Sequence, residues 1–589
     1  RSNQILAYRA METPEVARAN TYLLHDPAHP ELLPKSPLPA GGMLMQGENS
    51  LRSYLLRLAV DYDKHWGSHD LKAFAFTELR AAERTSTPFS GYGILYNRGG
   101  QILPSPGIFE KLSQENKSYF SDTRYTDRGV TFSASTTYGY AGRYIAHALI
   151  NLEGSNASGG RSHTQWLPTW NVGAKWNIDK ESFFSSSSAL SRLALRLSYG
   201  LTAKMNEEAI NAQAIYQGGL TQSVPYADRE RLLKILHLEN RDLTWEKMYE
   251  LNAGIEAAFL YGRLRATIDL YQRNAFDLID LVRTSGVGGQ YYKYANFGDM
   301  RTRGIELSLS SDNIRSEHFS WSSTLSLSWM NQQITRLRNT PNALDLVAGR
   351  GRGNLVGFPK GSLFSYNFQG LNSHGLPTFD FGLYPLNRGE ESRIYGADFG
   401  DTQYTKSYLT YHGPIEPQII GGLSNTFRYR DWDFTFFLTA QAGHKLRLNP
   451  TFDPTYGDLN VFGGMWRDRW INPGDERFTD VPTLPAQSLI QAVGKENIER
   501  AYSTYNYSQL RVADGSFIRL KHVSLGYRLP ASVARQLHLQ SAKIQVSLTN
   551  PFLLYSDKRL HGQDPEYFRS GGVSLPTPRQ CTFTLQLGL

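Results

Sequence analysis

Residues 249–271 read YELNAGIEAAFLYGRLRATIDLY and contain two runs in which the side chains alternate in character. In residues 249–257 the odd positions are apolar, and the even positions are polar or glycine. In residues 264–270 the even positions are apolar and the odd positions are polar. Successive side chains of a strand point to opposite faces, so each run predicts a β-strand. The short link around Gly262 predicts that the two strands form a hairpin.

The polar face of this hairpin carries four ionisable residues, which are Glu250, Glu256, Arg265 and Asp269. A soluble β-sandwich would turn such a face toward bulk water. A transmembrane barrel would turn it toward a wet lumen and press the apolar face against lipid. The hairpin alone leaves both environments open.

The composition argues against helical membrane spans but not against a barrel. The chain has 589 residues and a mean hydropathy of −0.42, and it contains no long apolar run of the kind that a transmembrane helix needs. Barrel strands need only ~9–11 residues, half of them polar. A large barrel therefore keeps a soluble-looking average.

The net charge and the cysteine content limit which partners, disulfides and metal sites are expected. The net charge of +8 is spread along the chain without a basic block, so we expect no nucleic-acid partner. The single cysteine, Cys581, predicts neither an internal disulfide nor a metal cluster. The chain begins at Arg1 rather than methionine, which suggests processing or a piece of something longer.

About 17 strands can be assigned by alternation, among them 53–63, 71–80, Ser362–Leu371 and 377–384. Residues 1–52 lack clean alternation and are expected to form an irregular extracellular loop, with barrel strands and long loops over 53–589. The strand near 516–528 alternates poorly, which predicts a bulge. Arg430 and Asp431 form a tight link, whereas the next link spans 444–515. Short and long links in alternation are typical of a bacterial outer-membrane barrel.

The same alternation constrains how the barrel closes. If the short links are periplasmic, the strand at 53–63 and the last strand both run inward. Two strands with the same direction cannot pair in an antiparallel barrel, and an open edge in lipid is costly. We therefore expect an odd number of further strands, five by this count, upstream of the chain.

Several motifs carry a family resemblance. Residues 514–530 read DGSFIRLKHVSLGYRLP, residues 549–552 read TNPF, and residues 562–566 read GQDPE. Residues 303–307 read RGIEL, and residues 470–476 read WINPGDE. In order and spacing, these segments resemble SusC/RagA-type TonB-dependent outer-membrane transporters over roughly residues 50–589.

The resemblance implies a 22-stranded, multi-pass barrel in the outer membrane of the Bacteroidota, without enzymatic activity or cofactors. It implies import of oligosaccharides or peptides, with TonB as the energy source and a SusD-like surface lipoprotein as a lid. The plug, the TonB box and the first barrel strands of that family are not found in this sequence, so a separate chain or fragment is expected to carry them. The last residue, Leu589, stands where the family usually has phenylalanine.

Two sets of residues are candidate sites. Trp466, Arg467, Arg469 and Trp470 lie in the longest predicted outer loop, where aromatic rings and guanidinium groups suit a sugar or a peptide backbone. The alternative is that both tryptophans pack the loop against its neighbours. The lumenal residues of the opening hairpin, Glu250, Glu256, Arg265 and Asp269, would contact either a plug or the substrate.

Other chemistry finds little support. The sequence has no HExxH, GxSxG or P-loop motif. The GRGRG run at 349–353 is expected to be a surface loop, and Asp453 and Asp458 a solvated loop rather than a calcium site. Two alternatives to transport stay open: a structural subunit of a larger outer-membrane complex, and a soluble multi-domain β protein.

Overall fold

The computed structural model describes residues 2–8, 42–95, 99, 101–102, 112, 118–156, 166–185, 189–204, 215–220, 231–237, 243–284, 286, 292–338, 340–348, 353–381, 408–450, 464–568 and 576–588. All statements below concern these residues. No helix among them is long and apolar enough to cross a membrane.

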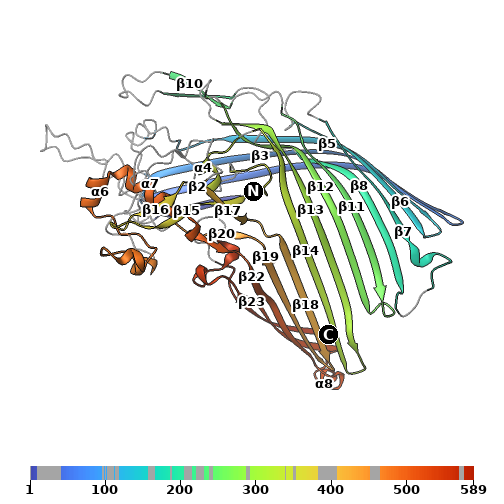
Figure 1. Cartoon of the computed structure of the whole chain (residues 1–589). Coiled ribbons are helices and arrows are strands. Elements are labelled where there is room, and N and C mark those ends of the chain that lie inside the picture. Colours follow the sequence, from blue (N-terminus) through green and yellow to red (C-terminus); the bar gives the residue numbers. More distant parts are fainter. Residues whose placement is uncertain are drawn as a thin grey trace.

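One antiparallel sheet dominates the molecule and forms a curved wall (Figure 1). In the described residues it has 17 strands, and strands that follow one another in the chain pair with one another in space. Two of them are short: β1 pairs only with the first residues of β2, and β4 pairs only with the last residues of β3. This is the large antiparallel barrel sheet that the alternation predicts. Its strands are β1 (Ser2–Tyr8), β2 (Gly42–Trp66), β3 (His69–Leu95), β4 (Gln101–Ile102), β5 (Thr123–Tyr140), β6 (Tyr144–Ser155), β7 (Trp166–Asn177), β8 (Arg192–Lys204), β11 (Glu246–Phe259), β12 (Leu264–Arg283), β13 (Tyr292–Arg315), β14 (Phe319–Leu337), β18 (Ile419–Tyr429), β19 (Trp432–Ala442), β22 (Phe517–Arg528), β23 (Ser541–Tyr555) and β24 (Gln580–Gly588).

The opening hairpin is confirmed as β11 and β12. Ile255 pairs with Ile268 and Glu256 pairs with Thr267, so the apolar and polar residues of the two strands share faces. The turn passes through Gly262, whose φ of +82° is left-handed backbone that glycine adopts without strain. We call the polar face of the main sheet the lumenal face.

The links between the strands sort by length between the two ends of the sheet. Tight turns at 67–68, 141–143, 260–263, 316–318 and 430–431 lie at one end, together with η3 (Ile178–Lys180) and α8 (Ala531–Gln536). The long connections lie at the other end (Figure 1). We call these ends the short-turn rim and the long-loop rim. The predicted alternation of short and long links is confirmed.

The long connections contain regular structure that sequence alternation did not predict. Parts of 340–381, 408–414 and 464–511 fold together at the long-loop rim, and we call this unit the loop domain (Figure 1). Its elements are α4 (Ala343–Ala348), β15 (Ser362–Leu371), β16 (Pro377–Asp380), β17 (Leu409–Pro414), η6 (Gly464–Asp468), η7 (Asp475–Arg477), α6 (Gln487–Val493), α7 (Lys495–Asn506) and η8 (Gln509–Arg511). The remaining elements are β9 (Ile215–Leu220) with β10 (Arg231–His237), β20 (Lys445–Arg447) with β21 (Val512–Asp514), η9 (Lys558–Leu560) and η10 (Pro565–Tyr567).

Two predicted barrel strands need correction. Ser362–Leu371 forms β15, and Pro377–Asp380 forms β16, but both belong to a separate three-stranded sheet with β17. In β15 the first five residues are all buried, because both faces of this small sheet are covered within the loop domain. The remainder of the predicted strand 377–384, beyond Phe381, lies outside the described residues.

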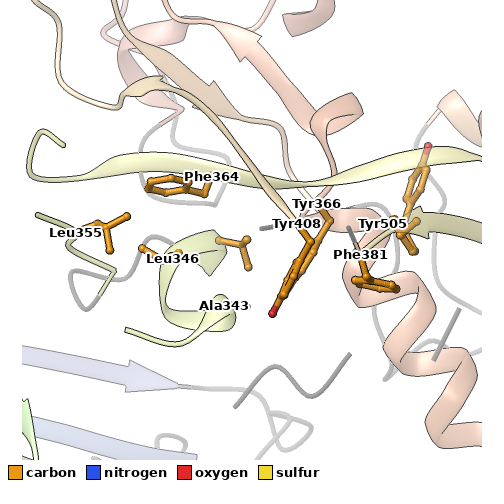
Figure 2. Close-up of a cluster of buried hydrophobic side chains, with 10 residues drawn as sticks. Ala343, Leu346, Leu355, Phe364, Tyr366, Phe381, Tyr408 and Tyr505 are labelled. Atoms are coloured by element: carbon orange, nitrogen blue, oxygen red, sulfur yellow. The ribbon is translucent and has the colours of Figure 1, made fainter. Parts of the chain in front are cut away.

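The loop domain has an aromatic core of its own (Figure 2). Tyr366 of β15 and Tyr408 are almost fully buried, and their rings stack with centroids 6.2 Å apart. Leu346 of α4 and Tyr505 of α7 complete the same cluster. Segments that are far apart in the sequence therefore hold one another over the long-loop rim.

The N-terminal expectation also needs correction in part. Residues 1–52 were expected to be irregular, but Ser2–Tyr8 forms β1, which pairs with the first part of β2. β2 itself already begins at Gly42. Residues 9–41 lie outside the described residues.

Candidate functional site

The lumenal face carries a ladder of ion pairs around the opening hairpin. Arg273 Nε donates to Glu250 Oε2 over 2.7 Å, and Lys175 Nζ donates to Glu256 Oε2 over 2.8 Å. Arg196 bridges Glu256 (3.1 Å) and Asp269 (2.9 Å). The charges of β7, β8, β11 and β12 thus neutralise one another across neighbouring strands.

Three of the four predicted lumenal residues are therefore engaged by partners within the wall. Arg265 lies on the same face near the short-turn rim, opposite Ala258, and is exposed. The structure thus brings Glu250, Glu256 and Asp269 together on one face. Their partners Lys175 and Arg196 come from strands that the hairpin sequence does not reveal.

A cavity of about 520 Å³ lies on the lumenal face between β12 and β22. Phe437 and Phe517 are among its lining residues, and Glu566, from the segment between β23 and β24, adds a carboxylate. Its charged lining residues are Asp269, Glu306, Lys521 and Glu566, and its hydroxyl side chains belong to Thr267, Ser308, Ser326, Ser328 and Thr439. The volume and the small number of placed charges are those of a site for a small polar ligand.

β22 is bulged beside this cavity. Leu520 pairs with Leu438 of β19 and His522 pairs with Phe437, so Lys521 is the extra residue between them. The register of β22 with β23 shifts at the same place. The predicted bulge is confirmed, and bulges often redirect a side chain beside a functional site. Poor alternation in residues 516–528 was the sequence signal, although Lys521 itself was not singled out.

Arg519 ties the segment after β23 to the wall. Its side chain is 7% exposed, and Nη2 lies 2.5 Å from Asp564 Oδ1 and 3.3 Å from Glu566 Oε2. Asp564 also accepts the backbone N–H of Glu566. The 514–530 and 562–566 motifs are therefore partners in one contact, which is a physical reason for both.

Two apolar hollows lie on the opposite face of the sheet. They have volumes of about 640 and 610 Å³ and are lined largely by alanine, leucine and aromatic side chains of strands between β2 and β12. In a barrel this face meets lipid. The polar cavity is therefore the better candidate for recognition of a water-soluble cargo.

The predicted outer-loop residues divide between interior and surface. Trp466 is 4% exposed and packs against Ile498 in the loop domain. Trp470 is 9% exposed, and its Nε1 donates to Glu476 Oε2 over 2.9 Å. That bond lowers the pKa of the Glu476 carboxyl.

Both tryptophans thus lie in the packed part of the loop. Arg469 Nη1 donates to the carbonyl of Trp466 over 3.0 Å, and Arg467 is exposed. Among the four, Arg467 is the residue whose side chain solvent reaches most freely.

Two arginines, one in β20 and one in η8 of the loop domain, bind carbonyl groups. Arg447 Nη2 donates to the carbonyl of Phe364, and its guanidinium lies 5.4 Å from the centre of the Tyr507 ring. Arg511 Nη2 donates to the carbonyl of Asn449 over 2.6 Å. Burial lowers the pKa of Arg447 to about 10 and also lowers that of Arg511. These side chains connect β15, β20 and η8.

The other candidates from the sequence are not part of the contacts described above. Asp453, Asp458, residues 349–352 and Leu589 lie outside the described residues. Cys581 of β24 is exposed. In the described part of the chain, no group of three or more His, Cys, Asp or Glu side chains is arranged to hold a metal ion.

Known proteins share this fold and sequence. Residues 36–411 match the family model described as "TonB dependent receptor-like, beta-barrel". TonB-dependent receptor P3 of Formosa agariphila is 24% identical over 524 residues, which cover 86% of this chain and 48% of that protein. TonB-dependent receptor SusC of Bacteroides thetaiotaomicron is 24% identical over 484 residues, which cover 79% of this chain and 44% of SusC.

A solved structure agrees at the level of the fold. The structure of the RagAB peptide transporter superposes with a TM-score of 0.70 at 22% identity, over 93% of this chain and 56% of that one. The chain spans about half the length of the curated relatives it matches. The family match extends over more than half of the sequence, and the curved sheet has the architecture that the family's description states. The chain belongs to the TonB dependent receptor-like β-barrel family of the outer membrane.

Proposed function

We propose that this chain forms the barrel wall of a SusC-like TonB-dependent transporter that imports oligosaccharides or peptides. The observation that carries the proposal is the lumenal cavity, which is polar, lies within the wall and has a volume in the range of ligand sites. SusC and the RagAB peptide transporter, which this chain resembles, support the same assignment.

The proposed complex includes partners. A SusD-like surface lipoprotein would cover the long-loop rim, where the loop domain offers a folded platform. TonB would act through a plug carried by a further segment or chain. In the described residues the free edges of β24 and of residues 50–66 of β2 have no pairing strand, and further strands would satisfy them.

Uptake in the source bacterium tests this function. Cells lacking this chain are expected to lose uptake of a labelled oligosaccharide or peptide from a panel, and the wild-type gene restores it. Cells lacking TonB should show the same loss. The lipoprotein should copurify with the chain from membranes extracted in mild detergent.

A structural role would give a different result. If uptake of every cargo is unchanged while a larger outer-membrane complex falls apart without the chain, the transport proposal is overturned and the chain is a structural subunit. A plug with a TonB box in the purified complex would favour transport instead.

A further inference from the structure

We propose that the apolar hollow of about 640 Å³ on the lipid-facing side of the wall binds one phospholipid of a particular class. The headgroup of this phospholipid carries both a phosphate and a free ammonium group, as that of phosphatidylethanolamine does. The inference goes beyond transport, because it concerns the lipid around the wall and not the cargo inside it.

Small side chains between large ones form the hollow. Ala146 of β6, Ala174 of β7 and Ala253 of β11 lie in one row of cross-strand neighbours. Tyr144 and Trp176 border this row, and their rings stack with centroids 6.4 Å apart. Lipid tails are as apolar as leucine, so binding within a bilayer depends on close packing, which small residues permit. A lipid tail can therefore lie along the row of alanines.

The hollow opens beside the short-turn rim. Tyr144 directly follows the tight turn at 141–143, and Trp176 lies just before η3. Short turns of outer-membrane barrels face the periplasm. Tyrosine and tryptophan are enriched where the tails of the bilayer meet its headgroups. A lipid whose tail fills the hollow therefore places its headgroup at the residues of η3.

Glu181 holds this boundary in place. Its side chain is 7% exposed, and its Oε1 accepts a hydrogen bond from Trp176 Nε1 over 3.0 Å. Its Oε2 accepts from Arg143 Nη1 over 3.3 Å. Glu181 and Arg143 thus neutralise each other, and Trp176 is fixed at the mouth of the hollow.

The two residues before Glu181 have no such partners. Lys180 is exposed, and none of the described residues forms a hydrogen bond or an ion pair with its ammonium group. This group lies at the tight turn, since a Cβ at Gly142 would be 2.8 Å from Lys180 Nζ. Asp179 Oδ1 is shielded from solvent but accepts no hydrogen bond within the described part of the chain. An acceptor in that state needs a donor.

A neighbouring cation and carboxylate match a headgroup that carries both charges. Lys180 can donate to phosphate oxygens, and an ammonium group can donate to Asp179. A phosphatidylglycerol headgroup has a phosphate but no cation for Asp179. A phosphatidylcholine headgroup has the cation, but its quaternary nitrogen has no N–H to donate. The ethanolamine headgroup satisfies both residues.

Native mass spectrometry of the complex extracted from outer membranes tests the inference. The complex is delipidated in mild detergent and is then offered phosphatidylethanolamine, phosphatidylcholine or phosphatidylglycerol with identical acyl chains. The wild type is expected to bind one molecule of phosphatidylethanolamine about tenfold more tightly than either of the others, because only this headgroup makes both charge-assisted contacts.

Three variants separate the parts of the site. Lys180→Gln removes the phosphate contact and should weaken binding of all three phospholipids about tenfold. Asp179→Asn should weaken binding of phosphatidylethanolamine about tenfold without weakening that of the other two. Ala174→Phe fills the hollow without changing a charge, and it should abolish the one-molecule binding of all three. A larger apolar side chain at this lipid-facing position leaves the fold intact.

Matched controls make the same changes elsewhere. Arg535→Gln removes an exposed cation from α8 at the same rim. Ala134→Phe fills the second apolar hollow, whose described lining contains no charged residue. Both variants should bind the three phospholipids as the wild type does. Far-ultraviolet circular dichroism of every variant shows whether the barrel is intact.

Several outcomes would overturn the inference. Equal binding of the three phospholipids by the wild type would show that the hollow contacts only the ordinary lipid of the bilayer. Unchanged binding in Lys180→Gln or Ala174→Phe would place the bound lipid elsewhere on the wall. Displacement of phosphatidylethanolamine by lipid A would assign the hollow to another class of lipid. Uptake of cargo tests the transport proposal separately, so either proposal can fail while the other stands.

Discussion

At the scale of single residues, Arg519 is the buried cation with the clearest consequence. Its side chain and that of Asp564 are 7% and 11% exposed. We expect Arg519→Ala to destabilise the protein by ~3–5 kcal/mol, because it leaves the buried carboxylate of Asp564 without a counter-charge. The midpoint of urea unfolding of the complex in detergent measures this loss.

The same substitution should release the segment after β23. Protease cleavage between β23 and β24, mapped by mass spectrometry, should become faster in Arg519→Ala. Lys558→Ala is the matched control, since Lys558 lies in the same segment and its side chain is exposed. Equal cleavage in both variants would show that Arg519 does not anchor this segment.

Tyr505 predicts how the loop domain responds to alkali. Burial raises its pKa from about 10 to about 12, and burial also raises the pKa of Tyr502 and Tyr366. A phenol whose folded pKa is raised contributes stability that is present below the unfolded pKa and is lost as pH rises through the folded pKa. The loop domain should therefore unfold between about pH 10 and pH 12.

Tyrosinate absorbance and near-ultraviolet circular dichroism measure this transition together. The buried tyrosines should ionise in one cooperative step that coincides with the loss of aromatic dichroism, while the far-ultraviolet β signal persists. Tyr505→Phe removes one of the titrating groups and should move the step to higher pH. Independent ionisation near pH 10 without loss of structure would contradict the prediction.

At the scale of elements, the pairing of β12 with β13 requires a residue without a side chain at position 304, opposite Tyr271. The two residues are cross-strand partners in β12 and β13, and a Cβ at position 304 would collide with the Tyr271 ring. Tyr271 is 7% exposed, so its ring has little room to move away. This contact is a physical reason for the glycine in the RGIEL motif.

Gly304→Ala is therefore expected to destabilise the barrel by ~1–3 kcal/mol through overpacking. The double variant Gly304→Ala, Tyr271→Leu should recover part of that loss relative to Tyr271→Leu alone. Urea unfolding of the four proteins in a double-mutant cycle measures the coupling. Additive effects would show that the ring does not depend on the glycine.

The elements also show which features could be predicted from the sequence and which could not. Alternation predicted β11, β12 and the bulge in β22, because each is determined by which residues face lipid or lumen. Alternation also predicted that Ser362–Leu371 is a barrel strand. That prediction was wrong because local alternation does not distinguish a barrel strand from a strand that is buried on both faces in the loop domain. The charge on the lumenal face was predictable, but its ion pairs depend on register with strands such as β8, which is a long-range property.

At the scale of the whole molecule, the candidate cavity illustrates the same division. Its charged residues come from β12, β13, β22 and the segment after β23, so no local motif contains it. The family resemblance predicted a lumen but not how its charges are paired. Arg196 of β8 engages Asp269 of β12, and Arg519 of β22 engages Glu566 from the segment after β23, so these pairs depend on long-range register.

The two free edges of the main sheet lead to the last prediction. β2 runs to the tight turn at 67–68, and β24 runs antiparallel to β23 toward the same short-turn rim. Strands with the same direction cannot pair in an antiparallel barrel, so an odd number of strands is required between them. Two predicted strands belong to the loop domain and not to the barrel. The barrel strands counted in the described residues are then fifteen. For a 22-stranded barrel the shortfall becomes seven instead of five.

Disulfide trapping in intact cells measures whether these edges meet. In a Cys581→Ser background, the pair Ser547→Cys and Thr582→Cys joins neighbouring residues of β23 and β24 and should cross-link under mild oxidation. The pair Ala59→Cys and Thr584→Cys should not, because other strands separate β2 from β24. Mass spectrometry of the native complex should then find peptides of the intervening strands, on this chain or on a companion. An efficient Ala59–Thr584 cross-link would mean that the sheet closes on itself, since unpaired edges cost several kcal/mol per backbone group in lipid.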